Sequence, residues 1–217
     1  MAERSPPPVP DTALHISYLR VPAGSVMHRI HHSNYRATQF NPTSAGNARF
    51  SPIHDSAGAV IPTLYAGSTF ECAAMETVFH DVPFAPGLKT YPKNKLDGYR
   101  HSRVEFLAEL RLVDLTNKAL RLLGVTRAQL IDTEKDQYPI CRHWAETIHA
   151  HATDIHGLYW VSRQDDTAVA IVLFGDRVPP GAVIQHSDER DLLDDEAAYS
   201  EIISLAEKIG VLIVPGP

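Results

Sequence analysis

The stretch from Gly46 to Asp81 contains the side chains best suited to chemistry. Arg49 lies in a polar loop flanked by glycine and asparagine, where a guanidinium can bind an anion through two parallel hydrogen bonds. Tyr65 ends a short apolar strand, and Glu76 follows on a predicted helix. Because Glu76 comes directly after Met75, at the edge of an apolar stripe, its carboxylate is either half-solvated or directed into a cleft.

The helix that carries Glu76 is predicted over residues 68–80. Ser68 and Glu71 have the spacing of a capping box, in which each side chain satisfies a backbone donor of the other residue. The following apolar residues recur three and four positions apart, at Cys72, Met75 and Phe79. One face of the helix should therefore pack on a core.

Length and charge restrict the classes of protein to consider. A chain of 217 residues with 44% apolar content is expected to form one domain with a full core. The net charge is -6, without a run of lysine or arginine, which argues against direct binding of nucleic acid. Cys72 and Cys141 are far apart in helical patterns and suit reduced core residues, although the sequence leaves a disulfide open.

The ends of the chain predict a cytoplasmic protein. Residues 1–15 begin with a proline-rich run and are expected to form a flexible tail, and no apolar segment there suggests a signal peptide. The longest apolar run, Ala168–Phe174, is too short to span a bilayer. Residues 16–217 are then expected to form the single domain.

The remaining elements alternate irregularly, which favours an α+β fold over a doubly wound sheet. Residues 31–50 read as a long polar loop and residues 81–102 as a connector rich in proline and glycine. Strands are predicted at Val26–Ile30, Arg103–Leu115, Gly157–Ser162, Ala168–Phe174, Val183–Ile184 and Val211–Val214. Helices are predicted within Asn117–Ile131 with Thr126 as a cap, at Tyr138–His151 and at Asp195–Ile209.

Several common site signatures are missing. The chain has no glycine-rich phosphate loop, HExxH, paired CxxC or GxSxG. Two groups of histidines invite a metal site: His28, His31 and His32, and His149, His151 and His156. No acidic or cysteine partner stands at ligand spacing, so no metal is expected.

A set of ordered motifs resembles the RES-domain family. The motifs are HRI at 28–30, GNARFSP at 46–52, LYAGSTFECAAMET at 64–77, and GLYWVSR before AIVLFGDRV. The resemblance covers about Val26 to Val178. The arginine, glutamate and serine that give the family its name correspond to Arg49, Glu76 and Ser162.

This resemblance implies a fold and an activity. RES proteins are toxins of bacterial toxin–antitoxin pairs with an ADP-ribosyltransferase-like fold, expected here as mixed central sheets flanked by helices. They act on NAD+, which different members hydrolyse, phosphorolyse or use to modify a protein. The partner is an Xre-type helix-turn-helix antitoxin that covers the active site, and toxin dimers within the larger complex would fit the family.

The arginines and the tyrosine suit the binding of NAD+. Arg29 and Arg49 can grip the pyrophosphate, although each could instead be a surface arginine or tether a loop. Tyr65 can stack on the cationic nicotinamide ring, or be a core tyrosine with its hydroxyl at the surface.

Glu76 and Ser162 suit the reaction itself. Breaking the nicotinamide–ribose bond builds positive charge on the sugar, which the Glu76 carboxylate would stabilise. Ser162 can bind the nicotinamide ribose or amide, or cap a turn at its strand end. The loop after Ser162 departs from many RES domains, having Gln164–Thr167 where an asparagine is frequent. That acidic loop favours water or a protein acceptor over free phosphate.

These observations predict a toxin that transfers ADP-ribose from NAD+ to a cellular protein. Two alternatives stay open. The chain could deplete NAD+ as a glycohydrolase or phosphorylase, or it could be a non-catalytic module that modulates the DNA binding of its antitoxin.

Overall fold

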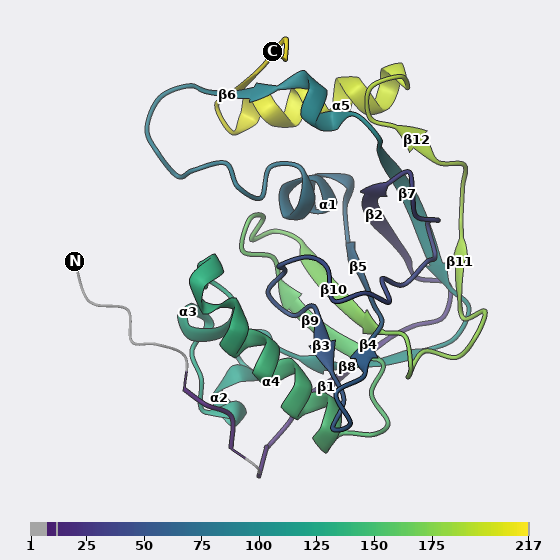
Figure 1. The fold of residues 1–217 in the computed structure, drawn as a ribbon, viewed down its shortest axis with the longest axis vertical. Helices are drawn as coiled ribbons and strands as arrows, with labels where there is room; N and C mark the ends of the chain where they lie inside the picture. Colours follow the sequence, from purple (N-terminus) through teal and green to yellow (C-terminus); the bar gives the residue numbers. More distant parts are fainter. Residues whose placement is uncertain (1–7, 12, 217) are drawn as a thin grey trace.

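The computed structural model describes residues 8–11 and 13–216. In this part of the chain, one large mixed sheet forms the centre of the fold (Figure 1). Its strand order is β1 (Tyr18–Val21), β8 (Leu110–Asp114), β9 (Gly157–Val161), β10 (Val169–Phe174), β5 (Thr63–Gly67), β2 (Val26–His32), β7 (Tyr99–Phe106) and β11 (Val183–Gln185), with β12 (Arg190–Asp191) also paired to β7. Strands β8 and β9 run parallel and the other neighbours antiparallel.

Two small sheets and five α-helices complete the described structure. The small sheets are β3 (Ile53–His54) with β4 (Val60–Ile61), and β6 (Lys89–Pro92) with β13 (Val211–Val214). The helices are α1 (Phe70–Thr77), α2 (Leu120–Leu123), α3 (Arg127–Leu130), α4 (Tyr138–His151) and α5 (Glu196–Lys208), with 3-10 turns at Lys93–Leu96 and Lys135–Gln137. The predicted α+β fold, with mixed sheets flanked by helices, is confirmed.

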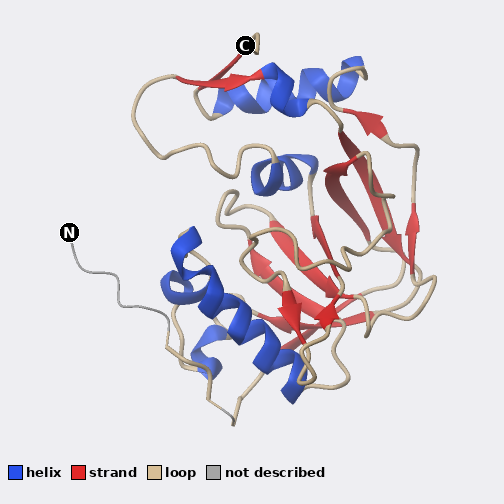
Figure 2. Cartoon of the chain, viewed as in Figure 1, coloured by secondary structure: helices blue, strands red, loops and turns tan. Residues whose placement is uncertain are grey.

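Helices cover two separate parts of the sheet (Figures 1 and 2). Helix α4 contributes Trp144 and Ile148 to a core with β8, β9 and β10. Helices α1 and α5 share a second core that includes Phe79 and Ile202. None of the helices in the described part of the chain is long and apolar enough to cross a membrane.

Strands β5 and β2 share fewer paired residues than the other neighbours in the large sheet. These strands pair through a single register position, His28 with Gly67, whereas β10 and β5 pair over five residues. Helix α1 begins immediately after this point, and a Cβ on Gly67 would lie 2.9 Å from the Cys72 sulfur. Glycine therefore lets the strand end approach the helix closely. The divergence of β2 from β5 leaves room for a site in front of α1.

Helix α1 differs from its prediction at both ends. Its N-cap is Thr69, whose hydroxyl accepts a hydrogen bond from the Cys72 amide at 3.0 Å. Ser68 is not the cap, because it still pairs with the neighbouring strand: its hydroxyl accepts a hydrogen bond from the Val169 amide, and its own amide donates to the Val169 carbonyl. Glu71 forms an ion pair with Lys208 instead of closing a capping box. The helix ends at Thr77, before His80.

The predicted strand Arg103–Leu115 is two strands. The chain turns after Phe106, and Leu107 is exposed. The break is required because β7 pairs with β2 and β11, whereas β8 pairs with β1 and β9 elsewhere in the sheet. The alternation of apolar and charged residues continues through the turn, so the sequence does not indicate a break there.

The predicted connector over 81–102 was also wrong in part. It contains β6, a 3-10 turn and the start of β7. Strand β6 pairs in parallel with β13, near the other end of the sequence, so a long-range partner overrides the local turn signals.

Other elements are confirmed. Helix α4 has the predicted bounds, and Thr126 caps α3 in a capping box with Gln129. Strand β10 is central, and α5 and β13 lie where predicted. Cys72 and Cys141 are buried and free.

The tail predicted at residues 1–15 falls partly on residues 1–7 and 12, which lie outside the described residues. Of the others, Leu14 packs in the core that contains α4. The Pro8 carbonyl accepts a hydrogen bond from the indole of Trp144 at 2.8 Å.

Candidate functional site

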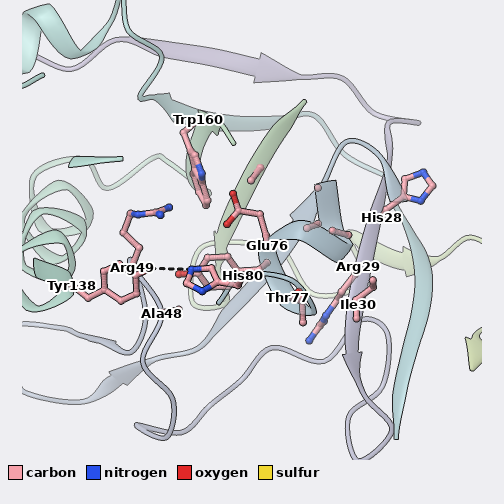
Figure 3. A pocket seen from close by; sticks show the side chains of 15 residues that line it. His28, Arg29, Ile30, Ala48, Arg49, Glu76, Thr77, His80, Tyr138 and Trp160 are labelled. Carbon is pink, nitrogen blue, oxygen red and sulfur yellow. Dashed lines mark hydrogen bonds between the residues drawn. The ribbon is translucent and has the colours of Figure 1, made fainter. Parts of the chain in front are cut away.

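A cavity of about 230 Å³ lies where β2 and β5 diverge. Its walls come from both strands, α1, the loop at Ala48–Arg49, the start of α4, and Trp160 on β9 (Figure 3). Four of the five residues predicted for the site line it: Arg29, Arg49, Tyr65 and Glu76. The fifth, Ser162, lies directly behind Glu76. Residues far apart in the sequence therefore meet at one site.

Glu76 is held by Ser162. The serine hydroxyl donates a hydrogen bond of 2.6 Å to the Glu76 carboxylate. The same oxygen accepts from the amides of Gln164 and Asp165, at 3.0 and 3.1 Å, and the Ser162 side chain is fully buried. Ser162 thus caps the turn after β9 and fixes one carboxylate oxygen of Glu76. Its hydroxyl is already used by the protein.

Arg49 is buried with an unused donor. The side chain is 4% exposed, its Nε donates to the Thr133 hydroxyl at 3.3 Å, and its guanidinium lies 5.6 Å from the centre of the Tyr138 ring. Its Nη2 has no hydrogen-bond partner within the described residues. Trp160 Nε1, on the same cavity, also lacks one. Buried donors are nearly always paired, so these two atoms are exceptions among the residues that line the cavity.

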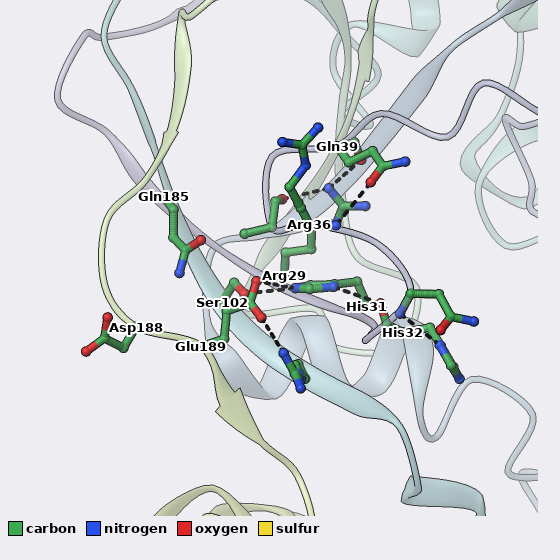
Figure 4. Close-up of polar contacts among 12 residues, drawn as sticks. Arg29, His31, His32, Arg36, Gln39, Ser102, Gln185, Asp188 and Glu189 are labelled. Carbon is green, nitrogen blue, oxygen red and sulfur yellow. Dashed lines mark hydrogen bonds and ion pairs between the residues drawn. The ribbon is translucent and has the colours of Figure 1, made fainter.

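Arg29 is anchored more firmly. Its Nη1 donates to the carbonyls of Ala37 and Gln39, at 2.7 and 2.9 Å, and so fastens the loop after β2 (Figure 4). Burial lowers its pKa to about 10, which the nearby Glu189 carboxylate opposes, so the group stays charged at neutral pH. Arg29 therefore tethers a loop, as one reading of the sequence allowed. It also lines both the main cavity and a neighbouring one of about 290 Å³.

Tyr65 presents its ring to the cavity. Its hydroxyl accepts a hydrogen bond from the Phe50 amide at 3.1 Å, and its ring contacts Trp160 edge to face, with centroids 6.2 Å apart. Burial raises the pKa of the phenol. The hydroxyl is thus bound inside the protein, whereas the sequence had left open a position at the surface.

The lining residues that the sequence did not predict include His80, Tyr138 and Trp160. The Tyr138 hydroxyl lies 3.0 Å from His80 Nε2, and His80 Nδ1 lies 2.7 Å from the Asp81 carboxylate. The sequence predicts Tyr138 as the first residue of a helix and Trp160 as part of a strand, and neither pattern indicates a place in the site. A signal existed in the adjacent His80 and Asp81 after α1, but their spacing alone does not identify a site.

The histidines on the β2 side form a neutral pair. His28 Nδ1 lies 2.9 Å from His101 Nε2, and Arg190 donates to His101 Nδ1. Burial lowers the pKa of His101 to about 3 and lowers that of His28 as well. No group of three or more histidine, cysteine or acidic side chains suited to a metal ion occurs in the part of the chain that the structure describes.

Comparison with known proteins agrees with this architecture. Residues 26–195 match the RES domain family. A solved structure described as the M. tuberculosis MbcT-MbcA toxin-antitoxin complex contains a chain with the same fold, at a TM-score of 0.60 and 15% sequence identity. The match covers 85% of this chain and 92% of that one. A comparison with curated protein sequences finds no significant match. Since the family match spans most of the sequence, the chain belongs to the RES-domain family.

Proposed function

We propose that this protein cleaves the nicotinamide–ribose bond of NAD+ and acts as the toxin of a bacterial toxin–antitoxin pair. The observation that carries the proposal is that two residues lining the cavity with Glu76, Arg49 and Trp160, each keep a buried donor, Nη2 and Nε1, without a partner among the described residues. NAD+ offers phosphate, ribose and carboxamide oxygens to such donors.

The two arginines suit the negatively charged part of NAD+. Arg29 lines both neighbouring cavities, and Arg49 lines the one that contains Glu76. A pyrophosphate near the junction of these cavities would be within the range of a guanidinium held by the Ala37 and Gln39 carbonyls. The two cavities together give a dinucleotide room for its two halves.

The reacting end of NAD+ belongs beside Glu76. Tyr65 and Trp160 supply aromatic surface for the flat nicotinamide ring, whose positive charge favours such contacts. When the bond to ribose breaks, its electron pair leaves with nicotinamide and positive charge develops on the sugar. The Glu76 carboxylate, oriented by Ser162, would stabilise that charge without having to reorganise.

ADP-ribose would then pass to an acceptor, and we favour a side chain of a cellular protein. Loss of ADP-ribose to water or phosphate is the alternative outcome of the same bond cleavage. The loop between α1 and β6 leaves Phe84 and Leu88 more than four-fifths exposed, and Phe84 lines a groove beside the site, which provides surface for a protein acceptor.

An antitoxin partner is supported by the structural similarity to a chain from a toxin-antitoxin complex. We propose an Xre-type helix-turn-helix antitoxin that covers the cavity, in a cytoplasmic hetero-oligomer that can contain a toxin dimer. No metal is required by this chemistry, because the charge that develops is stabilised by the Glu76 carboxylate.

The test is to incubate the purified protein with NAD+ labelled in the adenylate half, with and without phosphate and with and without bacterial lysate. Label on a protein band is the expected result and would identify an ADP-ribosyltransferase. Label in free or phosphorylated ADP-ribose would replace transfer by depletion of NAD+. NAD+ that stays intact in every mixture would contradict the enzyme and leave the non-catalytic module.

A further inference from the structure

Tyr138, His80 and Asp81 form a chain of hydrogen bonds at the edge of the cavity. We propose that these three residues form a proton relay, which deprotonates the acceptor that takes ADP-ribose. This inference rests on the proposed cleavage of NAD+. Such an acceptor is an oxygen that carries a proton, either in water or in a hydroxyl group. The relay adds a base to a site in which Glu76 stabilises charge.

The direction of the relay follows from its hydrogen bonds. The Asp81 carboxylate can accept but not donate, so His80 Nδ1 must carry a hydrogen toward it across 2.7 Å. Hydrogen bonds from Lys135 and His80 lower the pKa of Asp81, which keeps the carboxylate ionised. When the imidazole is neutral, its lone pair is on Nε2, which lies 3.0 Å from the Tyr138 hydroxyl. Tyr138 therefore donates to His80.

In this arrangement Tyr138 supplies the hydroxyl, His80 the base, and Asp81 the carboxylate that orients the base. Burial raises the pKa of Tyr138, so its phenol stays protonated on its own. His80 Nε2 can accept the phenol proton when the phenol oxygen receives a proton from the acceptor. The Arg49 guanidinium over the Tyr138 ring would also stabilise transient negative charge on the phenol.

His80 and Tyr138 separate two cavities. Both line the main cavity beside Glu76, and both line an outer groove of about 460 Å³ formed with Phe84, Lys135 and Arg163. Figure 3 shows the bonded pair next to Glu76. The acceptor oxygen would lie in the main cavity, where it can reach C1′ beside Glu76, and its proton would leave through Tyr138 and His80 toward the groove. The Tyr138 side chain is 1% exposed, so a proton can cross this partition without bulk water.

The bond from ribose C1′ to the nicotinamide nitrogen breaks, and its electron pair makes nicotinamide neutral. The acceptor oxygen bonds to C1′ and gives its proton to the Tyr138 oxygen, while the Tyr138 proton moves to His80 Nε2. The resulting imidazolium is stabilised by Asp81 and later loses its proton to solvent.

The same loop positions this relay and the catalytic carboxylate. Gln164 donates from its side chain to the His80 carbonyl at 3.2 Å, two residues after Ser162 fixes Glu76. The loop after Ser162 therefore contacts the His80 carbonyl directly and reaches Glu76 through the Ser162 hydroxyl. The contact explains how His80 can be held in place beyond the end of α1, which stops at Thr77.

The relay is tested with the variants Tyr138→Phe and His80→Gln, and with their double variant. NAD+ consumption is measured without phosphate and with saturating phosphate, because a phosphate dianion attacks without giving up a proton. Tyr18→Phe and His151→Gln serve as matched controls, since both side chains are exposed and neither lines the cavity. Affinity for NAD+ and melting temperature are measured for every variant.

Each relay variant is expected to lower kcat without phosphate by about 100-fold, with KM for NAD+ changed less than about threefold. The double variant should be no slower than either single one, and phosphate should restore most of the rate. Equal losses with both acceptors, additive losses, or lower melting temperatures that account for the loss would overturn the relay. If the wild-type protein consumes NAD+ only with phosphate, the relay is overturned but the proposed function stands. If the wild-type protein never consumes NAD+, the proposed function itself is overturned.

Discussion

Arg29 and Arg49 are both buried beside the cavity, but the protein holds them differently. Arg29 extends from β2, and its Nη1 is fully occupied by two loop carbonyls. Arg49 comes from a loop and, among the described residues, makes one hydrogen bond of 3.3 Å through Nε and leaves Nη2 unpaired. Leaving a buried charged donor unpaired costs free energy. We infer that Arg29 combines a structural role with ligand binding, whereas Arg49 is kept available for a ligand.

Glu76 extends this comparison. One carboxylate oxygen is fixed by Ser162, as Arg29 is fixed by its carbonyls, and the side chain also lines the cavity, as Arg49 does. Substitution should therefore separate the two contributions, because stability reports the internal contacts and NAD+ turnover reports the contacts with substrate.

The largest effect is expected from Glu76→Gln. Glutamine can still accept the Ser162 hydrogen bond but carries no negative charge, so kcat should fall about 100- to 1000-fold while NAD+ binds nearly as before. Steady-state kinetics and calorimetric titration would check this. The control is Glu71→Gln on the same helix, whose exposed pair with Lys208 contributes little. Equal turnover in both variants would contradict the role of Glu76.

Arg29→Met should mainly destabilise the protein. The carbonyls of Ala37 and Gln39 lose their charged donor, which is expected to lower the free energy of unfolding by about 2–4 kcal/mol. For a chain of this size, the melting temperature should fall by roughly 5–15 °C. Thermal unfolding measures the change. A melting temperature like that of the wild type would contradict the structural role of Arg29.

Arg49→Met should have the opposite signature. Losing a charged hydrogen bond to the ligand is expected to weaken NAD+ binding about 10- to 100-fold. The melting temperature should stay the same or rise, since an unpaired buried charge is removed. Arg20→Met, on an exposed side chain, controls for the general loss of charge. The comparison fails if Arg49→Met unfolds at a lower temperature than Arg29→Met.

The smallest effect is expected from Ser162→Ala. Glu76 keeps its charge but loses its fixed orientation, so kcat should fall only about tenfold. Two amides of the turn also lose their acceptor, which should lower stability by about 1–2 kcal/mol. Kinetics and thermal unfolding are compared with those of Ser56→Ala, in an exposed turn. A loss as large as that of Glu76→Gln would mean that Ser162 itself takes part in the reaction.

Local signals predicted most of the fold. Helix α4 carries its apolar face at regular spacing, and β10 is apolar on both faces, so both were recognised. The errors arose where distant segments decide the structure. Strand β6 exists because β13 pairs with it, and the break after Phe106 exists because β7 and β8 have different neighbours.

The candidate site could be predicted in part for a similar reason. Motif order placed Arg49, Glu76 and Ser162, and strand β2 placed Arg29. The serine's contact with Glu76 and the relay of Tyr138 with His80 join segments more than 50 residues apart. No pattern within one segment specifies such contacts, since they depend on how α1, α4 and β9 meet.

The most direct measurement is nicotinamide release from NAD+ by the wild-type protein and by Glu76→Gln at equal concentration. The account predicts steady release by the wild type, with ADP-ribose appearing on an acceptor in equal amount, and at least about 100-fold slower release by the variant. Absence of nicotinamide release by the wild type, or equal release by both proteins, would contradict the assignment of this cavity to NAD+ cleavage.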